Sequence, residues 1–279
     1  MRNKVEKEIR RKEIKQYISE HRRVFIIYIL LRLSVIMIAV AQFFNRNYEN
    51  FFLCILVLIL FMLPGFIEAN CPIDLPDTLE IIILLFIYSA EILGEVQSYY
   101  TIYPFWDTML HTMNGFLAAA IGFSLVDLLN RNKKLMFELS PFFMAVVAFC
   151  FSMTIGVLWE FFECMMDVFV GFDMQKDTIV TSIHSVLLHP EGLNKVVSIE
   201  NIQNTIVNGQ NLGIQGYLDI GLLDTMKDLF VNFIGAVVFS LIGYFYVKNR
   251  GNGKFARRFI PRMVEKDKQR SNLNGTDSQ

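Results

Sequence analysis

The sequence is poor in cysteine, and its few cysteines are not spaced for a structural or metal-binding role. Of 279 residues only four are cysteine, namely Cys54, Cys71, Cys150 and Cys164, and they lack the short paired spacing of a thiolate site. Cys54 and Cys150 also lie inside long apolar runs. We therefore expect neither a disulfide framework nor a thiolate metal site.

The sequence also lacks an appreciable net charge. The formal charge is -1, yet Lys and Arg gather at both ends of the chain while Asp and Glu gather between them. A protein that binds nucleic acid through charge carries a basic surface. This distribution instead bears on membrane topology, and we expect no nucleic-acid partner.

Long apolar runs are abundant. The chain is 53% hydrophobic, and its apolar residues are concentrated in runs of about 20 residues, the length that spans a bilayer. The first run is too long for a cleaved signal peptide and lacks a small-residue cleavage site, so we expect it to be retained. The fold is predicted to be all-α, a polytopic transmembrane helix bundle with about six spans. These spans cover 24–44, 50–68, 78–97, 105–129, 140–168 and 224–247.

The distribution of the 26 Lys and Arg residues predicts the orientation. Membrane proteins concentrate Lys and Arg in cytoplasmic segments. With both termini cytoplasmic, and Arg32 inside the first span, only Arg46, Lys176, Lys195 and Lys227 fall outside. We expect a multi-pass protein of a bacterial plasma membrane, in contact with membrane lipid. The predicted divisions are a basic cytoplasmic tail (1–23), five spans (24–168), an extracytoplasmic loop (169–223), a sixth span (224–247) and a basic, disordered cytoplasmic tail (248–279).

Three polar residues share one face at the start of the fourth span. Asp107, His111 and Asn114 are spaced four and three apart, which places them on one side of a helix. Ionisable side chains at membrane depth are costly unless a partner, a cation or water compensates them. The stripe therefore predicts a functional polar site.

Two later spans carry matching stripes, and the predicted topology brings all of them to the outer end of the bundle. Span four begins outside, span five ends outside and span six begins outside. Span three also ends outside and contributes Glu91 and Glu95. The stripes of spans five and six are Glu160, Glu163 and Asp167, and Asp224, Asp228 and Asn232.

The acids of this set outnumber its histidine and its nearest lysine, Lys227. Two forms of compensation remain, which are protonation of some acids and binding of a divalent metal. Carboxylate and amide oxygens with one imidazole suit Mg, Mn, Ca or Zn, and acid/His pairs on facing helices build di-metal sites.

The candidate roles follow from this chemistry. The expected metal ligands are Glu160, Glu163, Asp228, Asp224 and His111. Asp107 would orient His111, and these two are the candidate catalytic pair. Asn114, Asn232, Glu91 and Asp167 complete the polar site. Simpler roles compete, because Asp107 and Asp224 each begin a helix and could serve as N-caps, and Asp167 could lie at a solvated rim.

The long segment 169–223 is expected to cap the outer mouth of the bundle, since loops of this length are usually functional or partly ordered. It contains Asp173-Met174-Gln175-Lys176-Asp177, a near-copy of Asp224-Thr225-Met226-Lys227-Asp228. No membrane span follows the first copy, and we interpret the resemblance between the two copies as accidental.

Motifs in the last three spans resemble a known family. The matching residues are Trp106-Asp107, His111 and Gly115, then Trp159-Glu160 and Glu163, then Asp224, Lys227-Asp228 and Gly235-Ala236. In this order they are similar to the uncharacterised bacterial inner-membrane proteins of the YjdF type and, more distantly, to VanZ-like membrane proteins. The long outer loop departs from this pattern, and Asn232 is closer to the VanZ-like one. The resemblance implies a helical membrane protein with an acid-rich site and supplies no activity.

The leading hypothesis is a protein with an outward-facing, cation-binding carboxylate/His site that acts on a lipid-linked or phosphorylated cell-envelope substrate. If the protein is an enzyme, it is expected to be a metal-dependent membrane hydrolase, since no serine or cysteine nucleophile is evident. One alternative is an ion- or proton-coupled transporter, although no inverted repeat is visible. The other alternative is a structural scaffold whose polar network fixes helix packing.

Overall fold

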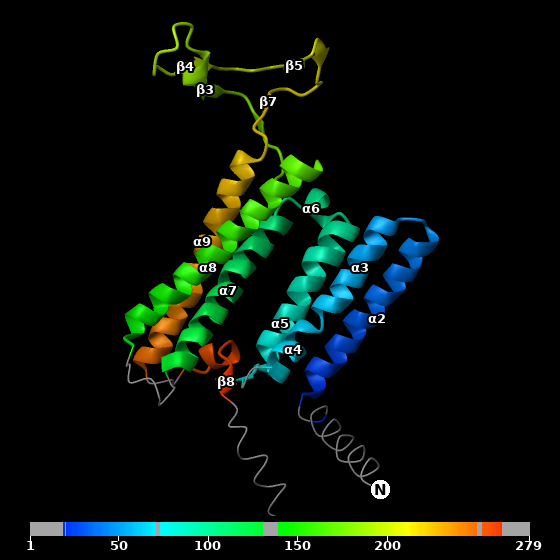
Figure 1. Cartoon of the computed structure of the whole chain (residues 1–279), viewed down its shortest axis with the longest axis vertical. Coiled ribbons are helices and arrows are strands. Elements are labelled where there is room, and N and C mark those ends of the chain that lie inside the picture. The colour runs from blue at the N-terminus through cyan, green and yellow to red at the C-terminus, as the bar shows by residue number, and fades with distance from the viewer. Residues whose placement is uncertain (1–18, 20, 71–72, 131–138, 250–252, 264–279) are drawn as a thin grey trace, which may run out of the picture.

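The structure is a computed structural model that describes residues 19, 21–70, 73–130, 139–249 and 253–263. It is helical throughout its body, as the sequence predicts, and a loop with short strands stands at one end (Figure 1). The helices are α2 (Arg22–Phe44), α3 (Tyr48–Leu60), α4 (Leu63–Asn70), α5 (Asp77–Ile87), η1 (Tyr88–Val96), α6 (Tyr99–Ile102), α7 (Trp106–Asn130), α8 (Pro141–Met165), η2 (Met166–Val170) and α9 (Leu222–Lys248).

Five of these helical segments are long and apolar enough to cross a membrane, and they confirm five of the six predicted spans. They are Arg22–Phe44, Tyr48–Asn70, Trp106–Asn130, Pro141–Val170 and Leu222–Lys248. The second of them bends between α3 and α4. Pro64 has no N–H to donate to the carbonyl of Leu60, where α3 ends.

The third predicted span, 78–97, differs from the other five. It is helical over Asp77–Val96, but it is divided into α5 and a π-helical turn, η1, that begins at Tyr88. This segment carries four acids, namely Asp77, Glu80, Glu91 and Glu95. Its charge sets it apart from the five apolar helices, although its length of 20 residues would cross a bilayer.

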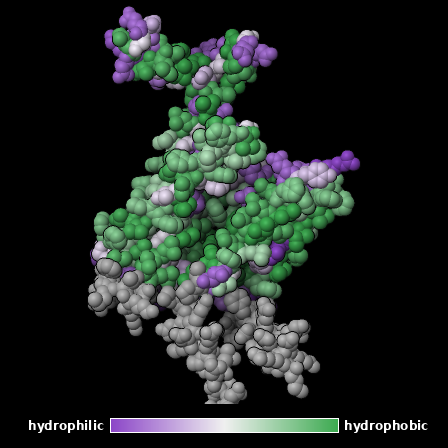
Figure 2. Space-filling view, in the orientation of Figure 1, coloured by the Kyte–Doolittle hydropathy of each residue, from purple (hydrophilic) through white to green (hydrophobic). Residues whose placement is uncertain are grey.

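The helices form two groups (Figure 1). Helices α7, α8 and α9 pack closely on one another around Phe123, Met144 and Phe239. Helices α2, α3 and α5 with η1 form a second group around Val35, Val57 and Leu84. The space-filling view shows apolar side chains over the helices of both groups and polar ones at the tips of the loop (Figure 2).

Small residues let α7 and α9 approach very closely. A Cβ atom at Gly115 of α7 would lie 2.1 Å from the backbone oxygen of Asn232, and one at Gly235 of α9 would lie 2.1 Å from that of Thr112. Glycine is therefore required at both positions, as in other membrane helix pairs that cross in contact. This crossing fixes the relative positions of the polar residues one and two turns nearer the helix ends.

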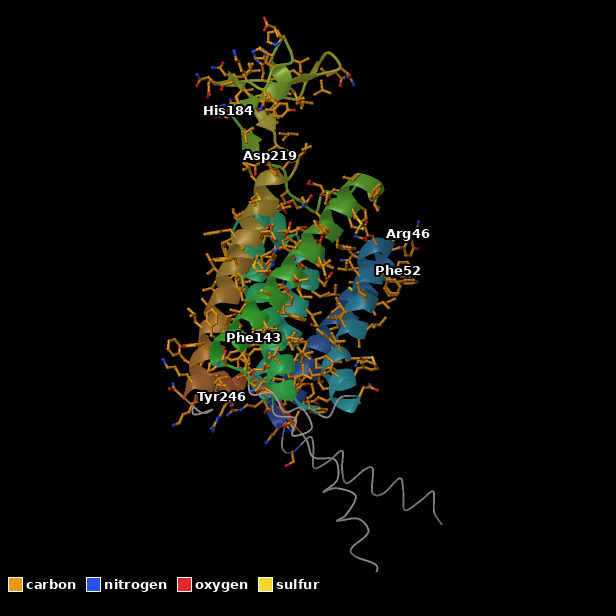
Figure 3. All side chains as sticks on the ribbon, turned by 60° about the vertical axis from the view of Figure 1, so that its left-hand side comes forward. Arg46, Phe52, Phe143, His184, Asp219 and Tyr246 are labelled. Carbon is orange, nitrogen blue, oxygen red and sulfur yellow. The ribbon has the colours of Figure 1, made fainter. Side chains whose placement is uncertain are left out.

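We refer to the end of the bundle from which the segment 171–221 emerges as the loop end. The segment folds as short antiparallel strand pairs: β2 (Ile179–Val180) with β7 (Tyr217–Leu218), β3 (Ile183–Ser185) with β4 (Val197–Ile199), and β5 (Ile206–Val207) with β6 (Gln210–Asn211). A 3₁₀ turn, η3 (Val186–Leu188), follows β3. Asp219 lies where the loop joins α9, and His184 lies farther from the helices (Figure 3).

Residues 253–263 correct one expectation. The tail after Lys248 is predicted to be disordered, yet this part folds back under the bundle as η4 (Ala256–Arg258) and β8 (Arg262–Met263). Strand β8 pairs with β1 (Ile73–Asp74), and Phe259 and Ile260 are buried in the core of the α7–α9 group. The prediction overlooked these apolar side chains because basic residues surround them. Most of the predicted N-terminal tail (1–18 and 20), together with residues 264–279, lies outside the described residues.

The exposed surface of the helices suits lipid. Phe52 of α3 projects from the bundle (Figure 3), Phe143 of α8 is exposed, and Met37 of α2 and Phe142 of α8 are 67% and 71% exposed. An outer surface with many exposed large apolar side chains is typical of a protein that contacts lipid. Cys54, Cys150 and Cys164 are free thiols, and Cys71 lies outside the described residues.

Candidate functional site

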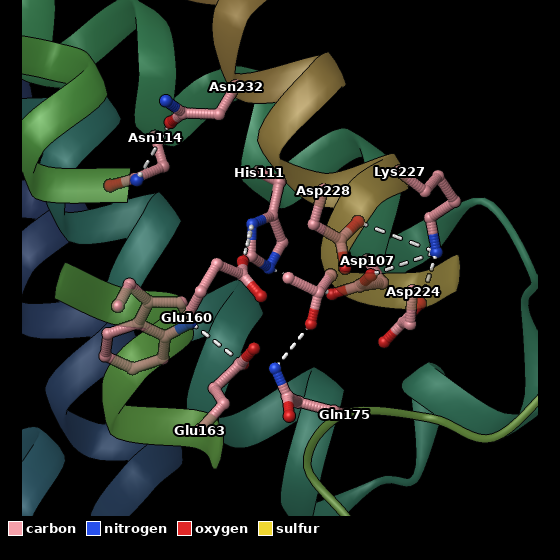
Figure 4. A network of polar contacts seen from close by, with 12 residues as sticks. Asp107, His111, Asn114, Glu160, Glu163, Gln175, Asp224, Lys227, Asp228 and Asn232 are labelled. Atoms are coloured by element: carbon pink, nitrogen blue, oxygen red, sulfur yellow. Dashed lines mark hydrogen bonds and ion pairs between the residues drawn. The ribbon is translucent and has the colours of Figure 1, made fainter. Parts of the chain in front are cut away.

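The predicted polar residues of the last three helices meet at the loop end of the α7–α9 group (Figure 4). Asp107 and His111 come from the first turns of α7, Glu160 and Glu163 from the last turns of α8, and Asp224 and Asp228 from the first turns of α9. The antiparallel order of the three helices places these turns at one level. The site is therefore assembled from segments far apart in the sequence.

His111 lies at the centre of the site and faces an acid on each side. Its Nε2 is 3.4 Å from Asp107 Oδ1, and its Nδ1 is 3.6 Å from Glu160 Oε1. His111 is 8% exposed and Glu160 is 4% exposed. The imidazole thus separates the site into two halves, one around Lys227 and one around Glu160.

The Lys227 half contains its own positive charge. Lys227 Nζ lies 2.7 Å from Asp224 Oδ1, 3.5 Å from Asp107 Oδ2 and 3.6 Å from Asp228 Oδ1. One ammonium group therefore contacts all three aspartates. A buried acid is tolerated when a partner of opposite charge lies this close.

The Glu160 half has no such group. Within the described residues, four buried side-chain atoms lack a hydrogen-bond partner, and three belong to this site: both carboxylate oxygens of Glu160, and Asp228 Oδ1. Glu163 receives a hydrogen bond of 2.9 Å from Trp159 Nε1. Buried polar atoms without a hydrogen bond are rare in folded proteins, so the oxygens of Glu160 are the atoms of this half that could accept a further ligand.

Two candidate ligand sets share His111. Asp107, His111 and Asp228 form one, and His111, Glu160 and Glu163 form the other, with the ligand atoms of each set within 4.8 Å of one another. An acidic cluster alone is weak evidence for a metal. Here a second observation supports it, since Glu160 is more than nine-tenths buried and its carboxylate oxygens make no hydrogen bond to the described residues.

A pair of amides lies one turn deeper. Asn114 Nδ2 donates to Asn232 Oδ1 over 3.2 Å, and Asn232 is only 1% exposed. The Asn232 amide packs against Gly156, where a Cβ would lie 2.6 Å from its nitrogen. This pair closes the site toward the interior of the bundle, because apolar residues such as Ala119 and Phe123 follow it.

Residues 173–176 of the loop lie against the acids at the loop end. The carboxylate of Asp167 accepts the backbone N–H groups of Met174 (2.6 Å) and Gln175 (2.8 Å), and Asp224 Oδ2 accepts that of Lys176 (2.9 Å). Gln175 Nε2 donates to Thr225 Oγ1 over 2.5 Å. Asp167 and Asp224 therefore anchor the loop at the site, and the two near-copies in the sequence touch there.

Two further polar residues, Glu91 and Tyr100, come from η1 and α6. Glu91 lies on η1 and is partly buried. Tyr100 of α6 packs on Gly94, and burial, together with the charges of Asp107 and Glu95, raises the pKa of its hydroxyl above the usual range. The Tyr100 hydroxyl therefore stays neutral and can donate a hydrogen bond.

The sequence did not indicate some residues of this site. Gln175, Thr225 and Trp159 contribute hydrogen bonds to it. Thr225 and Trp159 are sequence neighbours of the predicted ligands Asp224 and Glu160, whereas Gln175 is not next to any predicted ligand. The near-copy Asp173–Asp177 was the one signal that could have pointed to Gln175. Lys227 was recognised as the nearest basic residue, but its contact with three aspartates follows from the packing of α7 on α9.

Comparisons with known proteins give a family and no activity. Residues 26–249 match the model of a family described as "Predicted membrane protein (DUF2238)". That range includes His111 and the acids that surround it, namely Asp107, Glu160, Glu163, Asp224 and Asp228. No curated protein and no solved structure gives a significant match.

Proposed function

The chain belongs to this DUF2238 family of predicted membrane proteins, and we propose that its function rests on a divalent cation bound by Glu160, Glu163 and His111. The observation that supports the proposal is the buried carboxylate of Glu160, whose two oxygens make no hydrogen bond to the described residues. A divalent cation would pair both of its oxygens and offset the two glutamates of this half. Oxygen ligands with one imidazole suit Mg, Mn or Zn.

The orientation of His111 supports the same assignment. A metal-binding histidine commonly donates its second ring N–H to a carboxylate, which fixes the ring and its tautomer. Asp107 lies on the Nε2 side of the ring, 3.4 Å away, so Nδ1 faces Glu160 with its lone pair available. Asp107 would then be a positioning residue, and Trp159 would orient Glu163 in the same way.

The surroundings of the site favour a lipid-linked, phosphorylated substrate. Phe161, Phe169 and Phe230 are at least 60% exposed around the loop end, so the acids lie at the level of lipid chains and headgroups. Lys227 contacts three aspartates, but its side chain is 43% exposed, so a phosphate could still reach its ammonium group. With the loop end outside, as the distribution of Lys and Arg predicts, such a substrate would belong to the cell envelope.

The reaction class that these groups suit is metal-dependent hydrolysis. The cation would supply Lewis acidity to a phosphoryl oxygen, and Lys227 would hold a second one. Transport is the alternative from the sequence, but it needs a polar path to the opposite end. Beneath Asn114 and Asn232 the helices meet through Ala119, Phe123 and Phe239, all fully buried, which disfavours such a path.

Metal content is the decisive measurement. Purified protein, saturated with Mg, Mn or Zn in turn and then desalted, is expected to hold about one ion per chain by elemental mass spectrometry, and Glu160→Gln to hold none. Glu95→Gln is the matched control, because it removes an acid at the same end that belongs to neither ligand set. Absence of any stoichiometric ion from the wild type in all three saturations would overturn the proposal.

A further inference from the structure

A groove away from the acidic site lies between α8 and α9, in the half of the bundle opposite the loop end. It has a volume of about 420 Å³. Its lining comes from Phe142, Ala145, Val146 and Phe149 of α8 and from Phe233, Val237, Ser240, Leu241 and Tyr244 of α9. No charged side chain lines it, and Phe142, at 71% exposed, stands at its rim.

We propose that this groove binds one acyl chain of an anionic phospholipid from the leaflet opposite the loop end. Length is the first argument. From Phe233 to Tyr244 the groove follows α9 for eleven residues, which is about 16 Å at a rise of 1.5 Å per residue. One leaflet contributes about 15 Å of hydrocarbon, half of a core of about 30 Å. The groove thus matches a single leaflet.

Its two ends supply the second argument. Phe149 and Phe233 meet edge to face, with centroids 5.5 Å apart, and close the groove near the middle of α9. At the other end Lys248 lies one turn beyond Tyr244, with its Nζ 5.5 Å from the centre of the tyrosine ring. Lys248 is exposed at the end of α9, where an anionic headgroup would lie when the chain points toward Phe233.

The size of the groove separates this occupant from a helix of a second copy. A helix of the same length with a diameter of about 10 Å takes up roughly 1,200 Å³, well above the 420 Å³ observed. The floor also includes Ser240, whose buried hydroxyl has no hydrogen-bond partner. A lipid chain needs nothing from this hydroxyl, whereas a packed polar helix would be expected to pair with it.

The test is to count lipids on the purified full chain by native mass spectrometry and to identify them after extraction. The wild type is expected to retain about one anionic phospholipid per chain. Ala145→Phe fills the groove and is expected to lower retention at least about fivefold, since added volume excludes the chain. Leu33→Phe, on the exposed face of α2, is the matched control and is expected to retain the lipid.

Two further variants test the rest of the proposal. One separates the contribution of the headgroup from that of the acyl chain, and the other distinguishes a bound lipid from a bound protein helix. Lys248→Gln is expected to keep a bound lipid but to lose the preference for anionic headgroups. Ser240→Ala is expected to leave retention unchanged, because a lipid chain makes no hydrogen bond there. Equal retention in Ala145→Phe and Leu33→Phe would overturn the proposal. So would a lipid-free dimer that Ala145→Phe or Ser240→Ala converts to a monomer.

Discussion

Acidic side chains lie at both ends of the bundle, but their hydrogen bonding differs between the two ends. At the end opposite the loop, Asp77 Oδ1 lies 2.5 Å from His21 Nδ1, and Glu68 Oε1 accepts the backbone N–H of Leu75 over 2.8 Å. At the loop end, Asp228 Oδ1 and both oxygens of Glu160 are buried without a hydrogen bond. A cluster of acids is thus a poor indicator of a site, and unpaired oxygens are a better one.

The same contrast divides the loop end itself. Lys227 neutralises the side of His111 that carries Asp107, Asp224 and Asp228, whereas the side that carries Glu160 and Glu163 has no lysine or arginine in contact among the described residues. The positive charge on one side is therefore the ammonium group of Lys227, and on our proposal the positive charge on the other side is a bound divalent cation. Four changes test this comparison, in order of decreasing effect.

Glu160→Gln is expected to have the largest effect of the four changes. It is expected to abolish cation binding, and to raise the free energy of unfolding of the cation-free protein by about 1–3 kcal/mol, because a buried negative charge is replaced by a neutral amide. Isothermal titration and thermal melts in detergent measure both. Glu68→Gln, the same substitution at the opposite end, should leave cation binding unchanged. A Glu160→Gln variant that binds normally contradicts the assignment.

Asp107→Asn should weaken cation binding without abolishing it. Loss of a carboxylate that orients a metal-binding histidine typically costs 10–100-fold in affinity, so the dissociation constant is expected to rise by about that factor. The stoichiometry should stay at one ion per chain in the same titration. If Asp107 only caps α7, its loss will lower the melting temperature and leave the dissociation constant as in the wild type.

Lys227→Met should leave both sides of His111 with acids and no cationic side chain. Without the ammonium group, Asp107, Asp224 and Asp228 lack their shared partner, and a second equivalent of divalent cation is expected to bind there. The cation-free variant should lose about 1–2 kcal/mol of stability, less than for a fully buried pair because the lysine is partly exposed. Titration and melting curves at low and high cation concentration measure both effects. If the variant still binds one divalent cation per chain, a divalent cation does not replace the ammonium group of Lys227.

His21→Gln should have the smallest effect, and only on stability. Burial lowers the pKa of His21, but the hydrogen bond and the charge of Asp77, with Asp74 and Glu68, raise it overall above 6.5. A raised pKa means that the protonated pair stabilises the fold below about pH 6.5, and that this contribution is lost as the pH rises through the folded-state pKa.

The measurement for His21 is a pair of melting curves across this range. The wild type should exceed His21→Gln in melting temperature at pH 6, and the difference should shrink toward pH 9. Cation binding at the loop end should be the same in both proteins. A difference that grows with pH would contradict the sign of this linkage.

Much of the fold followed from the sequence because bilayer length and hydrophobicity are strong constraints. The segments 105–129, 140–168 and 224–247 agree with α7, α8 with η2, and α9 to within a few residues. The alternating direction of the spans also brought Glu160 and Asp228 to one level. The division of Asp77–Val96 at Tyr88 was not predicted, because a change of hydrogen-bond register to a π-helix leaves no periodic signal.

The chemistry of the site was less predictable than its location. The helical spacing of Asp107, His111 and Asn114 shows that they share a face of α7, but it cannot show that Lys227 reaches across to Asp107. That contact depends on the separation of α7 and α9, which Gly115 and Gly235 set through close backbone approach. Contacts of Gln175 depend on loop conformation, which no hydrophobic pattern encodes.

The return of residues 253–263 to β1 has a consequence for how the protein is made. The two helix groups emerge from the ribosome in sequence, and the segment that joins them at the end opposite the loop is synthesised after α9. Phe259 and Ile260 can enter their places only when both groups are already in the membrane. Assembly is therefore expected to have two stages. The helices insert first, and residues 253–263 pack against both groups afterwards, so that a nascent chain stalled before residue 253 would lack this contact.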